Sequence, residues 1–250
     1  MARPRDVQSE LLAGLTDANR ATILAFLADR VLIEVDLDDV ERELYVKVTS
    51  KLTLARDYAG EVRVRFNRLL LLLIKFLRSR MDLSSSHGKL AYLDACAPGE
   101  EPNEFELQFD LFNFLFGILS CDMERPNKVA GRSDIEIPQR GFRFVIEVKR
   151  TTSPKWSRFS LRGFLRQAGA YQATDKRLGV LAVLDLSRRD PGNPHFLDCL
   201  GVQRHRVAPG DYRSVVVLRI PGNRRSPSDQ AQPRRRTSGG PKRQPGKGRN

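Results

Sequence analysis

The chain has 250 residues, 40% of them hydrophobic, which is enough for one medium-sized domain with an accessory region. Its 43 Lys and Arg exceed its 30 Asp and Glu, and the net charge of +13 favours polyanionic partners. Its 3 cysteines include no Cys-x-x-Cys pair, which argues against a disulfide framework, a zinc site or a four-cysteine cluster and favours a reducing intracellular compartment, the cytoplasm or a nucleus.

No export or membrane segment is expected. Residues 1–5 are charged but no apolar core follows them, so a signal peptide is not predicted. The most apolar run, residues 69–74, is far shorter than the roughly 20 residues that span a bilayer. We therefore expect no membrane partner.

Residues 1–85 are predicted to form a mostly helical N-terminal region. Helices are expected at 7–15, 17–28, 36–54 and 62–81, and residues 31–35 fit a short strand or a buried turn. The last helix has basic residues opposite an apolar stripe formed by Phe66, Leu69, Leu70, Leu73, Ile74 and Leu77. Such a helix either packs against a core or binds nucleic acid, and the whole region either covers the core or recruits a protein partner.

A further long helix is expected at 103–119, after a loop at 97–103. Asn103 is a suitable N-cap for this helix. Glu104 and Glu106 lie in its first turn, where the helix dipole favours acidic side chains.

Residues 131–150 have the pattern of two strands joined by a turn at 138–141. In the second strand, large apolar residues alternate with a face that carries Glu147 and Lys149. The apolar face is expected to be the core, and it consists of Phe142, Phe144, Ile146 and Val148.

Pairing of these two strands is expected to bring Asp134 and Glu147 together. Two uncompensated carboxylates raise each other's pKa, and a hard divalent cation such as Mg²⁺ or Mn²⁺ removes the repulsion. The carbonyl of Val148 offers one more oxygen, and Lys149 offers a positive charge that orients water or neutralises a phosphate oxygen. Phosphodiester hydrolysis needs such a metal site and such a positive charge. An ordinary amphipathic hairpin with a charged solvent face would, however, have the same residue pattern.

The arrangement of Asp134 followed by Glu147-Val148-Lys149 resembles the PD-(D/E)xK nuclease superfamily, which has the restriction-endonuclease-like fold. The leading proline of the family motif is replaced here by Ser133. The resemblance implies that Asp134, Glu147 and the Val148 carbonyl hold the metal and that Lys149 acts in catalysis.

In this superfamily the first core helix also supplies a carboxylate to the metal site. The resemblance therefore implies that the helix at 103–119 provides one metal ligand. Glu104 and Glu106 compete for this role, with Glu104 preferred, and both acids are equally explained as stabilisers of the helix start.

The residues after the hairpin extend the resemblance. A helix expected at 160–173 carries Gln167 and Tyr171 on one face. This Gln-x-x-x-Tyr is similar to the motif of RecB-type exonuclease domains and implies contact with the substrate, although a helix packed by its tyrosine shows the same spacing. Lys155 and Arg158, in the basic loop before it, are expected to bind substrate as well. The apolar run at 179–186 fits a buried parallel strand.

The end of the chain changes in composition. A strand is expected at 212–220, and the Pro-Gly pair after it ends the sheet. Residues 223–250 contain nine basic residues and one acidic residue among Pro, Gly, Ser and Gln, so they are predicted to be disordered. Such a tail either binds phosphate backbones or serves as a solubilising extension.

Together these patterns predict an α/β protein with a restriction-endonuclease-like mixed sheet core flanked by helices. The expected division is a helical region at 1–85, a nuclease-like domain at 86–222 and a basic tail at 223–250. The expected function is Mg²⁺- or Mn²⁺-dependent hydrolysis of phosphodiester bonds, with DNA as the expected substrate. The alternatives are a catalytically silent module of this fold that binds nucleic acid or protein, and a helical adaptor. The pattern does not distinguish DNA from RNA as the substrate, or endonucleolytic from exonucleolytic cutting.

Overall fold

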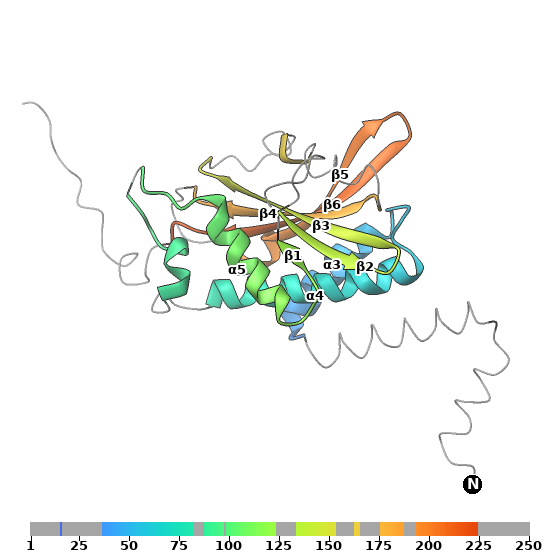
Figure 1. The fold of residues 1–250 in the computed structure, drawn as a ribbon, viewed down its shortest axis with the longest axis horizontal. Coiled ribbons are helices and arrows are strands. Elements are labelled where there is room, and N and C mark those ends of the chain that lie inside the picture. Colours follow the sequence, from blue (N-terminus) through green and yellow to red (C-terminus); the bar gives the residue numbers. More distant parts are fainter. Residues whose placement is uncertain are drawn as a thin grey trace, which may run out of the picture.

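The computed structural model of the protein describes residues 16, 37–82, 88–97, 99–123, 134–153, 163–165, 176–187 and 194–224. Several predictions lie outside these residues, namely those for 7–15, 17–28 and 31–35, for most of 160–173, and for the tail from residue 225. The described part is an α/β structure in which helices cover a mixed sheet (Figure 1). The prediction of an α/β protein with a mixed sheet is confirmed.

Six strands form one open sheet in the order β1-β2-β3-β4-β6-β5. They are β1 (Asp122–Met123), β2 (Ile135–Gln139), β3 (Phe142–Thr151), β4 (Leu178–Asp185), β5 (Leu200–Ala208) and β6 (Asp211–Pro221). The adjacent strands β3, β4 and β6 are parallel, and the other neighbours are antiparallel. The carboxyl ends of the three parallel strands therefore meet at one edge of the sheet.

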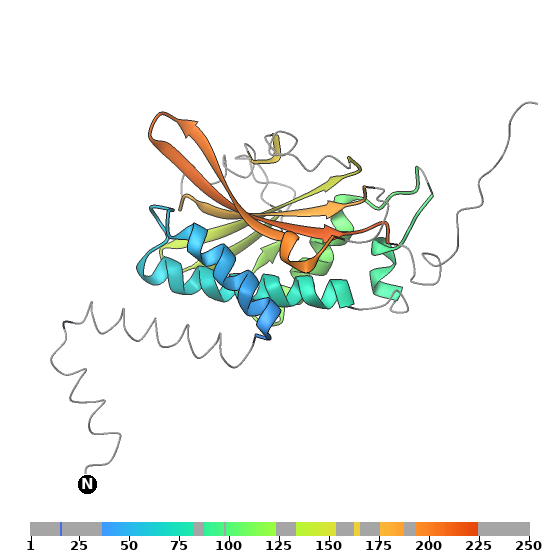
Figure 2. The same ribbon diagram turned by 180° about the vertical axis from the view of Figure 1, so that it is seen from behind.

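Two helices, α3 (Asp39–Leu52) and α4 (Gly60–Asp82), pack on one face of the sheet (Figure 2). A capping box starts α3, because the side chains of Asp38 and Glu41 each accept a hydrogen bond from the other's backbone N–H. The helices and the sheet share one buried cluster, in which the Phe66 and Phe144 rings meet edge-on with centroids 5.1 Å apart. The N-terminal region was expected either to cover the core or to recruit a protein partner. The structure shows that α3 and α4 cover the core.

All six apolar residues predicted for the stripe of α4 are buried. Leu71 and Phe76 are buried as well, so the buried face of the helix is wider than the sequence pattern indicated. On its edge, Lys75 forms an ion pair of 2.6 Å with the buried Glu41 of α3. This packing favours the interpretation of α4 as a core helix with a charged rim.

The opposite face of the sheet is also covered. A second buried cluster lies there, formed by Leu165, Leu181, Val183, Val215 and Val217. Every residue of β4 is buried, as expected for the predicted central parallel strand. Val145 and Glu147 of β3 are buried too, which corrects the expectation of one apolar and one charged face. The cluster combines Leu165 with side chains of β4 and β6, all of which lie outside the hairpin, so the hairpin pattern did not reveal it.

The hairpin between β2 and β3 turns at Arg140 and Gly141, so the predicted turn at 138–141 is too long. β2 continues through Pro138, where it pairs with β3 alone because the pairing of β1 ends at Glu136. An edge position tolerates the missing N–H of proline. Gly141 has a φ of +84°, a conformation that favours glycine.

The helix expected at 103–119 is α5 (Glu104–Phe116), and it begins where predicted. The Asn103 side chain caps it by accepting a hydrogen bond of 2.8 Å from the N–H of Phe105. The helix ends at Phe116 rather than at residue 119, because Gly117 follows and glycine disfavours helix continuation. One face of α5 is buried, and it consists of Leu107, Leu111 and Leu115.

Two strands were not predicted, the short β1 and the edge strand β5. Beyond Val202, β5 contains mostly polar residues, many of them exposed, and so lacks the alternation of a half-buried strand. Together with β6 it forms a hairpin that extends beyond the rest of the sheet (Figures 1 and 2). On this hairpin the Arg204 guanidinium lies 4.8 Å from the centre of the Tyr212 ring.

Two expectations concern the chain as a whole. No described helix combines the length and the apolar character that crossing a bilayer requires. All three cysteines, which are Cys96, Cys121 and Cys199, are free thiols.

The described chain ends at Arg224, which is held against η1 (Gly88–Leu93) and the residues after it. Its N–H donates to the carbonyl of Leu93 at 3.0 Å, and its carbonyl accepts from the N–H of Ala95 at 2.9 Å. Its guanidinium donates to the carbonyl of Arg80 at 2.6 Å. Residues 223 and 224 thus contact the body of the protein, although the sequence pattern assigned them to the tail.

We predict that two truncations have different effects on stability. A chain that ends after Arg224 should keep the wild-type free energy of unfolding. A chain that ends after Gly222 should lose about 2 kcal/mol, because it removes the hydrogen bonds of Asn223 and Arg224 to the body. Urea unfolding of the three proteins measures the difference, and equal stability of both truncated forms would contradict the prediction.

Candidate active site

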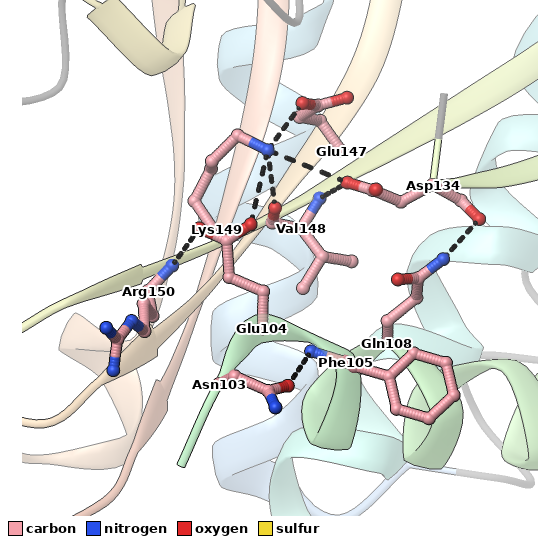
Figure 3. A network of polar contacts seen from close by, with 9 residues as sticks. All are labelled: Asn103, Glu104, Phe105, Gln108, Asp134, Glu147, Val148, Lys149 and Arg150. Atoms are coloured by element: carbon pink, nitrogen blue, oxygen red, sulfur yellow. Dashed lines mark hydrogen bonds and ion pairs between the residues drawn. The ribbon is translucent and has the colours of Figure 1, made fainter. Parts of the chain in front are cut away.

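Three segments bring charged side chains together at one place on the sheet (Figure 3). They are the start of α5, the residue before β2, and the carboxyl-terminal half of β3. The register of the hairpin pairs Ile135 with Ile146, and its continuation sets Asp134 opposite Glu147. The predicted convergence of these two residues is therefore present in the structure.

The ammonium of Lys149 lies at the centre of this group. Its Nζ is 2.7 Å from Oε1 of Glu147, 3.6 Å from Oε2 of Glu104 and 3.8 Å from Oδ2 of Asp134. It also donates a hydrogen bond of 2.8 Å to the carbonyl of Val148. One cation is thus surrounded by four oxygen atoms from the residues that the sequence singled out.

Asp134 is held in place by one hydrogen bond to its side chain and one to its backbone carbonyl. Its Oδ2 accepts a hydrogen bond of 2.6 Å from the N–H of Val148. Its backbone carbonyl accepts one of 2.9 Å from Nε2 of Gln108, which lies one turn after Glu104 on α5. These contacts fix the start of β2 to both β3 and α5.

Of the two acids at the start of α5, the structure places Glu104 in the site. Its Oε1 accepts a hydrogen bond of 3.2 Å from the N–H of Arg150, while its other oxygen faces Lys149. Glu106 takes no part in the group around Lys149, and its Oε2 is buried without a hydrogen-bond partner among the described residues. Each residue turns the helix by about 100°, so positions 104 and 106 lie on different faces.

Glu147 is the least solvated member of the group, with a side-chain exposure of 0%. Its Oε1 makes the ion pair with Lys149, while its Oε2 has no hydrogen-bond partner among the described residues. Burial raises the pKa of Glu147 to about 7, and the charges of Asp134 and Glu104 add to this effect. The attraction of Lys149 lowers the pKa but does not outweigh the burial.

The surroundings of Lys149, in contrast, favour the charged form of its side chain. Burial by itself lowers the pKa of its ammonium, because it disfavours the charged form. The contacts with Glu147, Asp134 and Glu104 outweigh burial, so the pKa of Lys149 is raised above its ordinary value. The ammonium therefore stays charged at neutral pH.

The donor set has the chemistry that Mg²⁺ or Mn²⁺ prefers, since it consists of carboxylate and carbonyl oxygens. Among the described residues Oε2 of Glu147 has no hydrogen-bond partner, so it is a potential ligand atom of this kind. However, within the described residues no group of three or more His, Cys, Asp or Glu side chains lies close enough to hold a metal ion. The cation that the carboxylates share here is the Lys149 ammonium, so metal binding would require Lys149 to move aside.

Other predicted site residues lie outside the described part of the chain. They are Lys155, Arg158, Gln167 and Tyr171. Conversely, sequence reasoning missed Gln108 and the backbone N–H of Arg150. Gln108 was detectable in principle, because it lies four residues after Glu104 and therefore on the same helix face.

No protein-family model, curated protein or solved structure matches this chain. The resemblance to the PD-(D/E)xK superfamily therefore depends on the motif residues and on their arrangement in space.

We predict a pH-dependent stability difference between the wild type and Glu147→Gln in the absence of metal. Folding raises the pKa of Glu147 from 4.5 to about 7, so ionisation of this group opposes folding. Its contribution to the free energy of unfolding is greatest below pH 4.5 and is lost as the pH rises through 7. The variant should therefore gain stability relative to the wild type, on the order of 2 kcal/mol, between pH 4.5 and 8.

Urea unfolding at several pH values checks this prediction. Glu100→Gln, at an exposed position, controls for the loss of one negative charge. A stability difference between wild type and Glu147→Gln that stays constant across this pH range would contradict the assignment of a buried, titrating carboxyl to Glu147.

Proposed function

We propose that the protein is a metal-dependent nuclease that hydrolyses phosphodiester bonds, with DNA as the expected substrate. The observation that carries the proposal is the fully buried Glu147, whose Oε2 has no hydrogen-bond partner among the described residues and which shares the Lys149 ammonium with Asp134 and Glu104. Buried groups with perturbed pKa values that cluster with charged partners are characteristic of functional sites.

A second buried carboxylate in the same sheet provides a comparison. Asp185, at the end of β4, has one oxygen 2.6 Å from Nε of Arg219, and its other oxygen accepts hydrogen bonds from the N–H and hydroxyl of Ser187. These partners fully account for the burial of Asp185. Among the described residues Glu147 has the Lys149 ion pair at Oε1 but no partner at Oε2, and a buried carboxylate oxygen without a hydrogen bond costs stability. A functional role for Glu147 explains why this cost is tolerated.

The order of the elements also supports the proposal. Helix α5, the acidic residue before β2, the Glu-x-Lys of β3 and the buried parallel strand β4 follow one another as the resemblance implies. The restriction-endonuclease-like fold is therefore the finer description that we propose for this mixed sheet.

Each residue of the group has a role in the proposed reaction. Asp134, Glu147, Glu104 and the Val148 carbonyl would hold Mg²⁺ or Mn²⁺, whose chemistry would supply charge neutralisation and water activation. Lys149 would place its ammonium against a phosphate oxygen or the attacking water. The hydrogen bonds from the Val148 N–H and the Gln108 side chain hold Asp134 in the geometry that this requires.

One observation favours the alternative, a catalytically silent module that binds nucleic acid or a protein. Lys149 already neutralises the carboxylates, and the described residues contain no preformed metal centre. If this ion pair is the functional state, neither Mg²⁺ nor Mn²⁺ should bind, and nucleic-acid binding should be independent of metal.

We predict that Lys149→Ala separates catalysis from metal binding. Removal of the ammonium leaves three carboxylates without a counter-ion, so Mn²⁺ should raise the melting temperature more in this variant than in the wild type. Cleavage of linear, circular and single-stranded DNA should be abolished. Glu147→Gln should lose both the Mn²⁺-induced shift and cleavage, because it lacks the buried ligand.

Lys51→Ala, at an exposed position of α3, is the matched control and should behave like the wild type in both assays. Wild-type cleavage by Lys149→Ala would exclude a catalytic role for this residue. Absence of any Mn²⁺-induced shift in the wild type would favour the silent module.

We also predict that the basic tail strengthens nucleic-acid binding through charge. Residues 225–250 contain eight basic residues and one acidic residue. Removing them should weaken binding and change the slope of log affinity against log salt by about 0.9 for each duplex phosphate that the tail neutralises. Fluorescence anisotropy at several salt concentrations measures this slope. An unchanged slope would show that the tail binds no phosphate groups.

A further inference from the structure

Helix α5 presents two large aromatic side chains to solvent beside the candidate active site. Phe105 is 55% exposed and Phe109 is 48% exposed. Their rings are stacked with centroids 5.8 Å apart and an angle of 22° between their planes. The pair therefore forms a short column of nearly parallel rings, and the rings remain open to solvent although burial would be favourable.

The position of this column follows from helix geometry. Glu104 and Gln108, which lie four residues apart, reach toward Lys149 and Asp134 respectively. Phe105 and Phe109 come one residue after Glu104 and Gln108. They therefore form a stripe that is rotated about 100° around the helix axis from those two residues. Figure 3 shows the Phe105 ring directed away from Lys149, on the side of the helix start where Gln108 lies.

We propose that Phe105 and Phe109 form a stacking platform for unpaired nucleobases. This inference rests on the proposed function. A strand whose phosphate contacts Lys149 would place the base of a neighbouring nucleotide on the Phe105 ring, with the Phe109 ring behind it. The substrates would then be single strands, or duplex ends at which bases can unpair.

The chemistry of the surface favours a nucleobase as its occupant. A phenylalanine ring offers a π-face but no hydrogen-bonding group, which suits stacking that tolerates every base. The platform is continuous with the charged group through Glu104, the residue that precedes Phe105. The exposed Arg150 donates to the carbonyl of Pro102 just before α5, so a positive charge for the backbone lies at the start of the same helix.

The test is the affinity for fluorescein-labelled oligothymidylate of about 12 nucleotides, measured by anisotropy in EDTA so that no metal contributes. Two further probes are an oligomer of the same length that lacks bases and a duplex with blunt ends. Phe105→Ala and Phe109→Ala should each weaken binding of oligothymidylate about fivefold or more, the factor that corresponds to about 1 kcal/mol. Binding of the abasic oligomer should not change.

Phe116→Ala is the matched control. Phe116 is 61% exposed and lies at the far end of the same helix, so its removal should leave the affinity for all three probes unchanged. Phe105→Trp should keep the wild-type affinity, and its indole fluorescence should be quenched when oligothymidylate binds. This variant shows that an aromatic surface, and not a particular packing of Phe105, is required.

Three results would overturn the platform. One is equal weakening for the abasic oligomer, and another is equal weakening by Phe116→Ala. The third is a wild-type dimer in sedimentation that Phe105→Ala dissociates, which would show that a second copy of the chain covers this face. If the wild type binds and cleaves DNA while both alanine variants bind normally, the platform is wrong but the nuclease proposal stands. A wild type that neither binds nor cleaves nucleic acid would overturn both.

Discussion

The burial of one carboxylate imposes the main constraint on this structure. Glu147 lies on a central strand between two apolar layers, and a charge in such a place must be compensated or neutralised. The compensation comes from Lys149, two residues along the same strand, whose ammonium Asp134 and Glu104 also contact. The start of α5 and the start of β2 are fixed in position by hydrogen bonds to β3, so the fold and the charge cluster depend on the same contacts.

Different parts of the sheet have different structural roles. α3 and α4 cover one face and bury most of the apolar surface, while β4 is enclosed on both faces. The neutralised pair of Asp185 and Arg219 shows how this sheet accommodates a charge that has only a structural role. At Glu147, Oε1 contacts Lys149 while Oε2 has no hydrogen-bond partner among the described residues, and this contrast is the reason why the proposed site is on β3.

Much of the fold was predictable where local pattern and burial agree. The strands β2, β3, β4 and β6 and the helices α3, α4 and α5 follow from alternation, helical periodicity and caps. The second buried cluster was not predictable from the hairpin, because its residues are Leu165 and side chains of β4 and β6. In the site, the meeting of Asp134 and Glu147 followed from strand pairing. The choice of Glu104, the support from Gln108 and the central place of Lys149 required three-dimensional geometry.

The parallel direction of β3, β4 and β6 has a consequence for the end of the chain. Lys149 lies near the carboxyl end of β3, and β6 ends at the same edge of the sheet before the chain reaches Arg224. The eight basic residues that follow are thus covalently attached on the side of the candidate site, and away from the β5–β6 hairpin. If the tail binds a polyanion as proposed, this attachment would raise the local concentration of that polyanion near Lys149, and capture of a strand and its delivery to the candidate site would be a single intramolecular process.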